Sequence, residues 1–316
     1  METTRSSTAL RAQLVVRPAE LADRPGLEAI EARIWDGDDY LPHVIDDWFN
    51  DPYNGFYVAA LHDQIVGTVK LTRFAEGEWW MEGLRVDPDY HQQGISRILH
   101  HFVINQVRQY RYGVVRFTTS SLNVAVHRLA LQTGFEHKAS YLPYSAPPLN
   151  EPVQTLVPLT PADAPRVRAW LEGSPHFARA QRSYESDWSL YYLTDARLAT
   201  RLETGLVYGW GEQQLQGVVI VNPARDASWP DSELLKIAYL DPGADVAACL
   251  RDVRRLAAFL ERGGVRLKAL KQPERIQALA NAGFEREWDG EVWLYARDLS
   301  LTRFAQVLTE ELPPLS

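Results

Sequence analysis

The sequence is poor in cysteine and has no long apolar run. The single cysteine, Cys249, cannot form an intramolecular disulfide, and it excludes a zinc site built from several thiolates. We expect it to be a small buried residue of a helix. No stretch approaches the ~18 apolar residues of a membrane-spanning helix, and residues 1–13 lack the apolar segment of a signal peptide. These absences predict a cytoplasmic protein with a reduced thiol and no membrane partner.

Positive charge is also in deficit. The chain of 316 residues has 33 Lys and Arg against 41 Asp and Glu, which gives a formal net charge of −8. No basic run is present to neutralise the phosphates of a nucleic acid, so nucleic-acid binding is disfavoured. The content of 46% hydrophobic and 23% charged residues is typical of a globular protein, and the length allows two domains.

Short patterns recur in both halves of the sequence. The matching positions, in chain order, are Gly67 and Gly217, Asp87 and Asp241, and Gly134 and Gly283. Their offsets are 150, 154 and 149 residues. Because the matches keep their order at a nearly constant offset, they indicate an internal duplication. We therefore predict two tandem domains, residues 1–145 and 153–316.

The expected join between these domains is rich in proline. Pro143, Pro147, Pro148 and Pro152 all fall within residues 141–152. Proline fixes φ and has no backbone N–H, so we expect this segment to continue neither a helix nor a central strand.

The spacing of apolar residues predicts the elements of the first half. Between Gly94 and Tyr110 they recur at helical spacing, and β-rich runs precede this segment. A meander of strands followed by strands that alternate with helices is typical of a mixed α/β (α+β) sheet, mostly antiparallel and flanked by helices. We expect this plan in both domains. The first-half strands are predicted at 13–17, 56–61, 65–74, 78–86, 114–119 and 135–142, and the helices at 20–35, 41–49, 94–110 and 124–133.

Candidate chemistry concentrates in the turn that leads from the strand ending at Val86 to the helix beginning at Gly94. A helix N-terminus carries unpaired N–H groups and partial positive charge, so it can bind an anion. Gly94 and the small Ser96 allow a diphosphate to approach the backbone, and Arg97 adds a charged donor. The first half has no Gly-x-Gly-x-x-Gly after an early strand, and the chain has no Gly-Lys-Ser/Thr, which disfavours Rossmann and P-loop nucleotide sites.

The same turn resembles the signature of the GNAT superfamily of acetyl-CoA-dependent N-acyltransferases. Val86, Pro88 and Gly94 match it, and Asn123 precedes the Gly134-Phe135 pair by eleven residues, while His91 and Ser96 depart from the usual residues. The resemblance implies that the strand ending at Val86 binds the pantetheine arm and the following loop binds the diphosphate of acetyl-CoA. The implied cofactor-binding residues are Leu84, Arg85, Val86, His91, Gln92, Gln93, Gly94, Ile95, Ser96, Arg97 and Asn123.

The resemblance also suggests catalytic residues. Acyl transfer from a thioester to an amine needs a base and a proton donor for the thiolate. Glu82 is the candidate base, and Asn123 either binds the cofactor arm or caps a helix. Ala130 occupies the family's usual tyrosine position, which leaves His127 on the same helix, or water, as the proton donor.

The second half keeps the plan but loses this site. Asp245 lies near the start of the helix that follows Asp241-Pro242, where a carboxylate would repel a diphosphate. Gln272 and Leu279 occupy the positions of Asn123 and Ala130. We predict a degenerate second domain, in a tandem layout that resembles mycothiol synthases.

Two functions are consistent with these patterns. The first is direct transfer of an acetyl group from acetyl-CoA to a small-molecule primary amine, by a monomer or homodimer without a metal ion. The second is a catalytically silent acyl-CoA sensor or scaffold. A cationic amine is favoured if the acids between Ile34 and Val69 line the acceptor site, since one sign of charge attracts the other; alternatively they are helix caps and solvated side chains. These acids are Asp36, Asp38, Asp39, Asp46, Asp47, Asp51 and Asp63.

Overall fold

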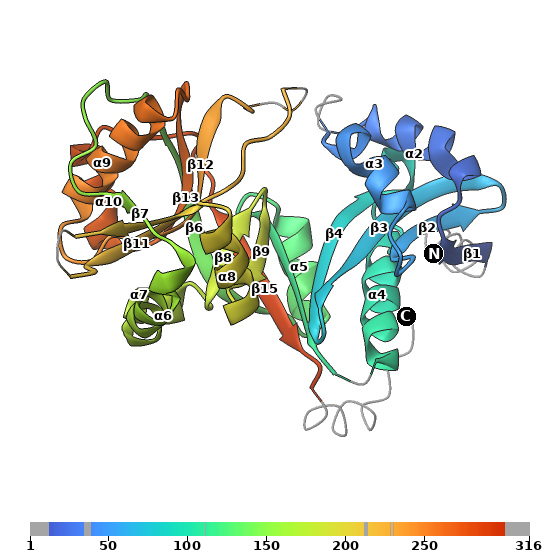
Figure 1. Cartoon of the computed structure of the whole chain (residues 1–316). Helices are drawn as coiled ribbons and strands as arrows, with labels where there is room; N and C mark the ends of the chain where they lie inside the picture. Colours follow the sequence, from blue (N-terminus) through green and yellow to red (C-terminus); the bar gives the residue numbers. More distant parts are fainter. Residues whose placement is uncertain are drawn as a thin grey trace. The chain divides into compact units, whose positions relative to one another are not determined.

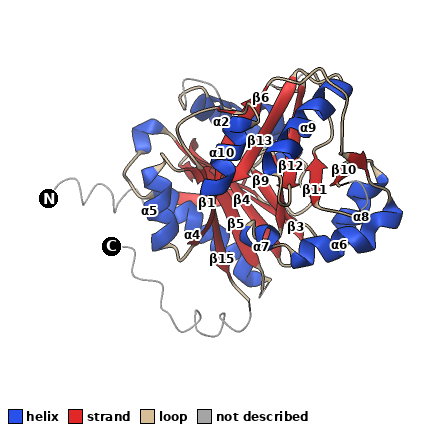
Figure 2. Ribbon diagram, turned by 90° about the vertical axis from the view of Figure 1, so that its left-hand side faces the viewer, coloured by secondary structure: helices blue, strands red, loops and turns tan. Residues whose placement is uncertain are grey.

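The computed structural model describes residues 13–34, 39–110, 112–211, 214–227, 229 and 231–300. Within these ranges the chain forms two compact units (Figure 1). The first contains residues 13–117, 124–136 and 295–300, and the second contains residues 118–123 and 137–294. Each unit has a mixed sheet with helices beside it, which confirms the predicted fold class (Figure 2).

The sheet of the first unit has the order β1-β2-β3-β4-β5-β15. Neighbours from β1 to β4 are antiparallel, and β4 and β5 are parallel. The strands are β1 (Leu14–Pro18), β2 (Phe56–Leu61), β3 (Gln64–Ala75), β4 (Glu78–Val86), β5 (Val114–Ser120) and β15 (Val292–Asp298), of which β5 and β15 continue into the second unit. The predicted strands of this meander are therefore confirmed.

Helices of the first unit cover its sheet with apolar faces. They are η1 (Leu21–Asp23), α2 (Arg24–Glu31), α3 (Leu41–Phe49), η3 (Pro88–Tyr90), α4 (Ile95–Gln109) and α5 (Val124–Gln132). Helix α4 packs on β3 and β4 through Leu99 and Val103, both fully buried. The single helix predicted at 20–35 is instead a 3-10 turn followed by α2, because Glu20 and Asp23 form a capping box and Pro25 lies in the first turn of the α-helix. Residue 35 lies outside the described residues.

The second unit repeats much of this order. Its main sheet runs β6-β13-β12-β11-β10-β7, β14 pairs with β6, and β8 and β9 form a separate hairpin. The strands are β6 (Glu136–Ala146), β7 (Val157–Pro158), β8 (Ser183–Ser186), β9 (Ser189–Tyr192), β10 (Val207–Trp210), β11 (Gly217–Val221), β12 (Leu234–Asp241), β13 (Gly264–Leu270) and β14 (Glu285–Arg286). The helices are η4 (Pro161–Asp163), α6 (Ala164–Gly173), α7 (Pro175–Arg179), α8 (Asp195–Glu203), α9 (Val246–Phe259) and α10 (Pro273–Asn281). As expected, Cys249 is buried on α9.

Two glycines from the sequence repeat have the same structural role. A Cβ atom on Gly67 of β3 would lie 2.9 Å from the carbonyl oxygen of Arg85 in β4. A Cβ atom on Gly217 of β11 would lie 2.5 Å from the carbonyl oxygen of Asp241 in β12. In both units the strand that the glycine approaches is also the first strand of a parallel pair: β4 pairs with β5, and β12 pairs with β13. The repeat therefore extends to backbone packing.

The compact units interleave along the chain rather than following the repeat. Residues 137–146 of β6 belong to the second unit, where residues 141–146 pair with β13, and residues 295–300 belong to the first unit. Our expectation that the proline-rich join ends the strand is wrong, because β6 continues through Pro143 to Ala146. Pro143 lacks only a donor, and its carbonyl oxygen accepts a hydrogen bond from the backbone N–H of Glu287 at 3.2 Å.

None of the helices in the described part of the chain is both long and apolar enough to cross a membrane. Among the same residues, no cluster of three or more His, Cys, Asp or Glu side chains could hold a metal ion.

Candidate active site

The loop after β4 is fixed at its start by ion pairs. The Asp87 side chain accepts a hydrogen bond from the backbone N–H of Asp89 at 2.9 Å and thereby caps η3. Arg33 contacts both carboxylates, at 2.9 Å from Asp87 and 2.8 Å from Asp89. These contacts define how the chain leaves the strand and approaches α4.

The N-terminus of α4 has the geometry of an anion site. Gly94 is the N-cap residue with φ of +81°, and no side chain caps the helix. Gln92 also has a positive φ, +61°, which is uncommon for a residue with a side chain and marks local backbone strain. The first N–H groups of a helix have no partner within it, so they are suited to an anion. Ser96 and Arg97 lie half-buried in this first turn.

His91 ties this loop back to β4. Its Nε2 atom lies 2.9 Å from the carbonyl oxygen of Val86, and since a carbonyl can only accept, the imidazole donates. The residue that departs from the family signature therefore has a positioning contact in the loop. The resemblance by itself implies only a cofactor-binding role for His91.

The parallel ladder between β4 and β5 is short. Its register runs from Glu78 opposite Val114 to Trp80 opposite Arg116. A buried ion pair between Arg116 and Glu78, at 2.6 Å, links the two strands across this ladder. Leu84 and Val86 lie beyond the end of the ladder, on the same strand. A strand that diverges from its neighbour is suited to pair with an extended ligand, as the resemblance implied for pantetheine.

The guanidinium of Arg85 is already engaged within the domain and is not a candidate donor to a cofactor. It forms a bidentate ion pair with Asp39, and the side chains are 1% and 0% exposed. The guanidinium also lies 4.8 Å from the ring centre of Tyr40. Only the backbone of Arg85 is therefore a candidate for pantetheine binding.

A bulge in β4 separates this segment from the candidate base. The β3–β4 register shifts between Thr68 and Lys70, and Gly83 has φ of +66°. A Cβ atom on Gly83 would lie 2.5 Å from Trp48, so glycine is required for two reasons. Bulges of this kind redirect the side chains beside them and are frequent next to active sites.

Glu82 lies directly before the bulge. It is half-buried, accepts a hydrogen bond from the Thr72 hydroxyl at 2.9 Å, and is the cross-strand partner of Lys70. Burial raises the pKa of the Glu82 carboxyl above its ordinary value, although the Thr72 hydrogen bond and the nearby Lys70 act in the opposite direction. A carboxyl with a raised pKa is better matched to proton transfer near neutral pH.

Tyr295 is a residue that sequence reasoning missed. It lies on β15 with 2% exposure, and its hydroxyl is 3.1 Å from Nδ1 of His127 on α5. Its ring stacks on Phe117 of β5, with 5.3 Å between ring centres. No local pattern could reveal this pair, because the two residues are separated by 168 positions.

For the remaining predicted residues the structure gives burial and local contacts, but nothing that tests their proposed roles. Asn123 is half-buried directly before α5, and its backbone N–H bonds to the carbonyl of Ser120 at 2.9 Å, so its role stays a prediction. Of the other predicted positions, Arg85 and Ile95 are buried, His91 and Gln92 are exposed, and Leu84, Val86, Gln93, Gly94 and His127 are half-buried.

Comparison with known proteins decides the family of the first unit. Residues 25–135, which contain β4, the loop, α4 and all of α5, match the acetyltransferase (GNAT) family. Residues 25–135 form a GNAT acetyltransferase domain. The protein is accordingly an acyltransferase. No curated protein matches the chain.

Solved structures with the same fold extend over both halves of the chain. A GCN5-related N-acetyltransferase from Sphaerobacter thermophilus has a TM-score of 0.62 at 14% identity, covering 91% of this chain and 96% of that one. A putative acetyltransferase from Pyrococcus horikoshii has a TM-score of 0.54 at 12% identity, covering 90% and 89%. A GCN5-related glucosamine N-acetyltransferase region of a fungal β-N-acetylglucosaminidase has a TM-score of 0.59 at 11% identity, covering 90% of this chain and 38% of that one.

The acidic segment of the GNAT domain is largely neutralised within the domain. Asp39 pairs with Arg85, Asp46 with Arg24 and Asp51 with Lys70, so the expected wall of uncompensated acids is wrong for these three. Asp47 and Asp63 are exposed, and Asp36 and Asp38 lie outside the described residues.

The second half lacks an open helix N-terminus at the corresponding place. Asp245 is the N-cap residue of α9 and accepts a hydrogen bond from the backbone N–H of Ala248 at 3.0 Å. Leu279, the counterpart of Ala130, is a buried core residue. A carboxylate therefore caps the helix of the second half, whereas α4 of the GNAT domain has no side-chain cap at the corresponding place.

Proposed function

We propose that the GNAT domain transfers the acetyl group of acetyl-CoA directly to the primary amine of a small molecule. The observation that carries the proposal is the N-terminus of α4 at Gly94, which no side chain caps. The strand that leads to it, β4, extends beyond its pairing with β5 and carries the half-buried Glu82. The second half, with its helix capped by Asp245, would be a degenerate copy that does not share the reaction.

The residues present fit acetyl-CoA. Backbone N–H groups from Gln92 to Arg97 would hold the diphosphate, because Gly94 places no side chain there and Arg97 adds positive charge. The backbone from Leu84 to Val86 would hold pantetheine, with Asn123 as a further candidate contact. When bound, acetyl-CoA supplies an acyl group that is activated as a thioester.

In this mechanism Glu82 acts as the general base. It takes a proton from the amine as the new bond forms between the amine nitrogen and the acyl carbon, and the carbon–sulfur bond breaks. Tyr295 gives its hydroxyl proton to the departing sulfur. His127 then returns a proton to the phenolate oxygen through their hydrogen bond and takes up a proton from water in exchange. The pair therefore supplies the proton donor that Ala130 does not provide.

The class of amine is less constrained. Internal pairing of Asp39, Asp46 and Asp51 weakens the electrostatic argument for a cationic acceptor. A similar structure is named as a glucosamine N-acetyltransferase region, which adds amino sugars to the candidates. We therefore include neutral amines, polyamines, basic amino acid derivatives and amino sugars as test acceptors.

The test is release of free thiol from acetyl-CoA in the presence of this amine panel. We expect acetyl-CoA-dependent acetylation of at least one small amine, and thermal stabilisation of the full chain by CoA. Stabilisation by CoA without turnover on any amine would instead support the silent sensor or scaffold. Absence of both stabilisation and turnover would overturn both functions.

A further inference from the structure

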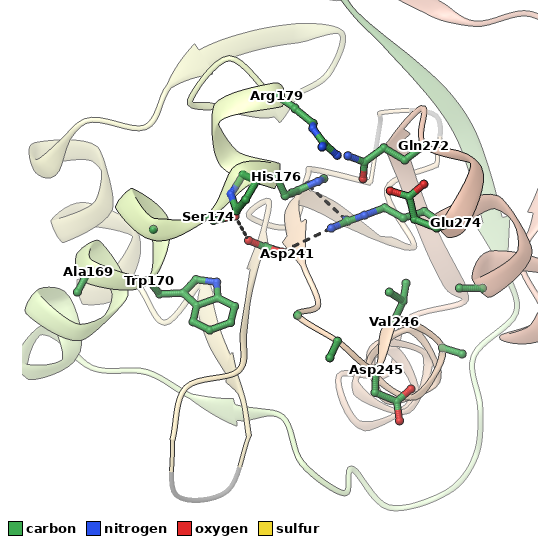
Figure 3. A pocket seen from close by; sticks show the side chains of 17 residues that line it. Ala169, Trp170, Ser174, His176, Arg179, Asp241, Asp245, Val246, Gln272 and Glu274 are labelled. Atoms are coloured by element: carbon green, nitrogen blue, oxygen red, sulfur yellow. Dashed lines mark hydrogen bonds and ion pairs between the residues drawn. The ribbon is translucent and has the colours of Figure 1, made fainter.

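A large cavity in the second unit lies apart from the GNAT domain. It has a volume of about 880 Å3, and all of its lining residues belong to the second unit. Its walls come from α6, α7, the loop between β12 and α9, and the start of α10 (Figure 3). This volume is within the usual range of small-molecule sites.

One wall of the cavity is a closed network of polar groups. The buried carboxylate of Asp241 accepts a hydrogen bond from the Ser174 hydroxyl and lies 3.5 Å from the guanidinium of Arg275. Arg275 also donates to the carbonyl of Leu240 at 3.2 Å. Because the positive and negative groups compensate each other, this wall is polar but without net charge.

His176 extends this network with a donor. Its Nε2 atom lies 3.3 Å from Arg275, which can only donate, so Nε2 accepts and Nδ1 carries the hydrogen. Burial, and then the charge of Arg275, lower the pKa of His176, which keeps the ring neutral. Nε1 of Trp170, in the facing helix α6, is buried without an acceptor among the described residues. Unsatisfied buried donors are destabilising, so this wall favours a ligand that brings acceptors.

Arg179 supplies an uncompensated positive charge. It is exposed at the end of α7, its side chain points toward Gln272 (Figure 3), and no carboxylate in the described part of the chain pairs with it. Besides Asp241, two carboxylates line the cavity, those of Asp245 at the N-cap of α9 and Glu274 in the first turn of α10, and both interact favourably with the positive end of their own helix.

We propose that this cavity binds a small organic monocarboxylate, held by the Arg179 guanidinium and the side-chain amide of Gln272. A planar guanidinium matches a carboxylate in a bidentate arrangement, and one uncompensated cation matches one negative charge. The indole of Trp170 offers an apolar surface for the rest of the ligand (Figure 3). A diphosphate such as that of CoA is disfavoured, since Asp245 already caps α9. The proposal does not depend on the function of the GNAT domain.

The test measures binding to the full chain by calorimetry and thermal unfolding, with acetate and benzoate as carboxylates and with inorganic phosphate and CoA as comparisons. Arg179→Gln removes the charge, and Gly173→Leu places a bulky side chain on the lining of the cavity, where nothing lies within 4 Å of a Cβ atom. Arg168→Gln is the matched control, since Arg168 is an exposed arginine of α6 that pairs with Asp195 outside the cavity.

We expect benzoate to bind and to raise the unfolding temperature, with affinity at least roughly tenfold weaker in Arg179→Gln. Gly173→Leu should abolish binding, and Arg168→Gln should leave it unchanged. The proposal is overturned if no carboxylate binds, or if Arg179→Gln binds as well as the parent. Tighter binding of phosphate than of either carboxylate would also overturn it. So would displacement of benzoate by CoA in Gly94→Val, a variant in which CoA should no longer bind the GNAT domain.

Discussion

The hydroxyl of Tyr295 lies 3.1 Å from Nδ1 of His127. Helical side chains lean toward the N-terminus, so a tyrosine at position 130 would cover the preceding turn of α5, which contains His127. Tyr295 reaches that turn from β15, and its stacking on Phe117 fixes the ring. A phenol is therefore present beside α5 even though the helix itself carries Ala130.

Replacing Tyr295 with Phe should lower kcat for acetyl transfer by roughly 10²-fold, the lower range for loss of a general acid. The ring and its packing remain, so we expect the KM for acetyl-CoA and the unfolding temperature to change little. Steady-state kinetics with the best amine of the panel measures this split. Tyr144→Phe, which removes the hydroxyl of a buried tyrosine on β6, should have no effect on kcat. An unchanged kcat in Tyr295→Phe would show that water protonates the sulfur.

Local sequence signals predicted most elements of the first half. The strand from Glu78 to Val86 and the helix from Leu41 to Phe49 have the predicted bounds, since periodicity and turn residues act over short distances. The placement of residues 137–146 of β6 in the second unit, and of residues 295–298 of β15 in the first, could not be predicted in this way. Strand pairing between distant segments depends on contacts that a single sequence does not reveal.

The candidate site shows the same limit. The motif predicted a cofactor site at the α4 N-terminus, because its residues are closely spaced along the chain, and the resemblance made Glu82 on the preceding strand the candidate base; both roles stay predictions. It missed Tyr295, and it missed the pairing of Asp39 with Arg85. Counting charges along a segment gives their number, but only the fold determines which of them are neutralised by a partner.

Replacing Gly94 with Val should abolish CoA binding. The residue needs φ of +81°, and a branched side chain would occupy the space where the backbone approaches the diphosphate. Isothermal titration with CoA measures the affinity, and circular dichroism checks the fold. Gly205→Val is the matched control, because Gly205 has φ of +69° in open space in the second unit and so carries similar backbone strain. If Gly94→Val binds CoA like the parent, the diphosphate has been assigned to the wrong turn.

Replacing Glu82 with Gln should lower kcat/KM by roughly 10²-fold or more through loss of the base. In the parent, activity requires the ionised carboxylate. It should therefore rise with pH through a midpoint above the ordinary carboxyl pKa, because burial raises the pKa of Glu82. That rising limb should be absent from Glu82→Gln and present in Glu31→Gln, a half-buried glutamate of α2. A rising limb that persists in Glu82→Gln would assign the base elsewhere.

His100 should make the stability of the protein sensitive to acid. It is fully buried between Phe117 and Phe135, and burial lowers its pKa to about 3. In the unfolded chain an ordinary histidine titrates near 6.5, so between these values the unfolded state binds more protons. The free energy of unfolding should therefore fall as pH decreases through this window, by at most ~1.4 kcal/mol per pH unit from this group.

The measurement is urea unfolding of parent and His100→Asn between pH 7 and pH 4. Asn keeps a donor for the Thr133 hydroxyl, which lies 2.9 Å from Nδ1 of His100, but it does not titrate. We expect the variant to be less stable at pH 7 and to lose part of the slope, with the remainder due to other groups such as His176. Parallel pH dependences in the two proteins would contradict a neutral buried His100.

Replacing Asp39 with Asn should destabilise the GNAT domain rather than alter acceptor choice. Its partner Arg85 is almost fully buried, and removal of one member of a buried ion pair leaves an uncompensated charge that costs about 3–5 kcal/mol. We expect a lower unfolding temperature, whereas Asp47→Asn, at an exposed acid of the same segment, should have no effect. The double variant Asp39→Leu and Arg85→Met should recover much of the loss, because neither charge then remains in the interior. Unchanged stability, together with a KM that rises for cationic amines and for no others, would instead indicate that Asp39 contributes to the acceptor site.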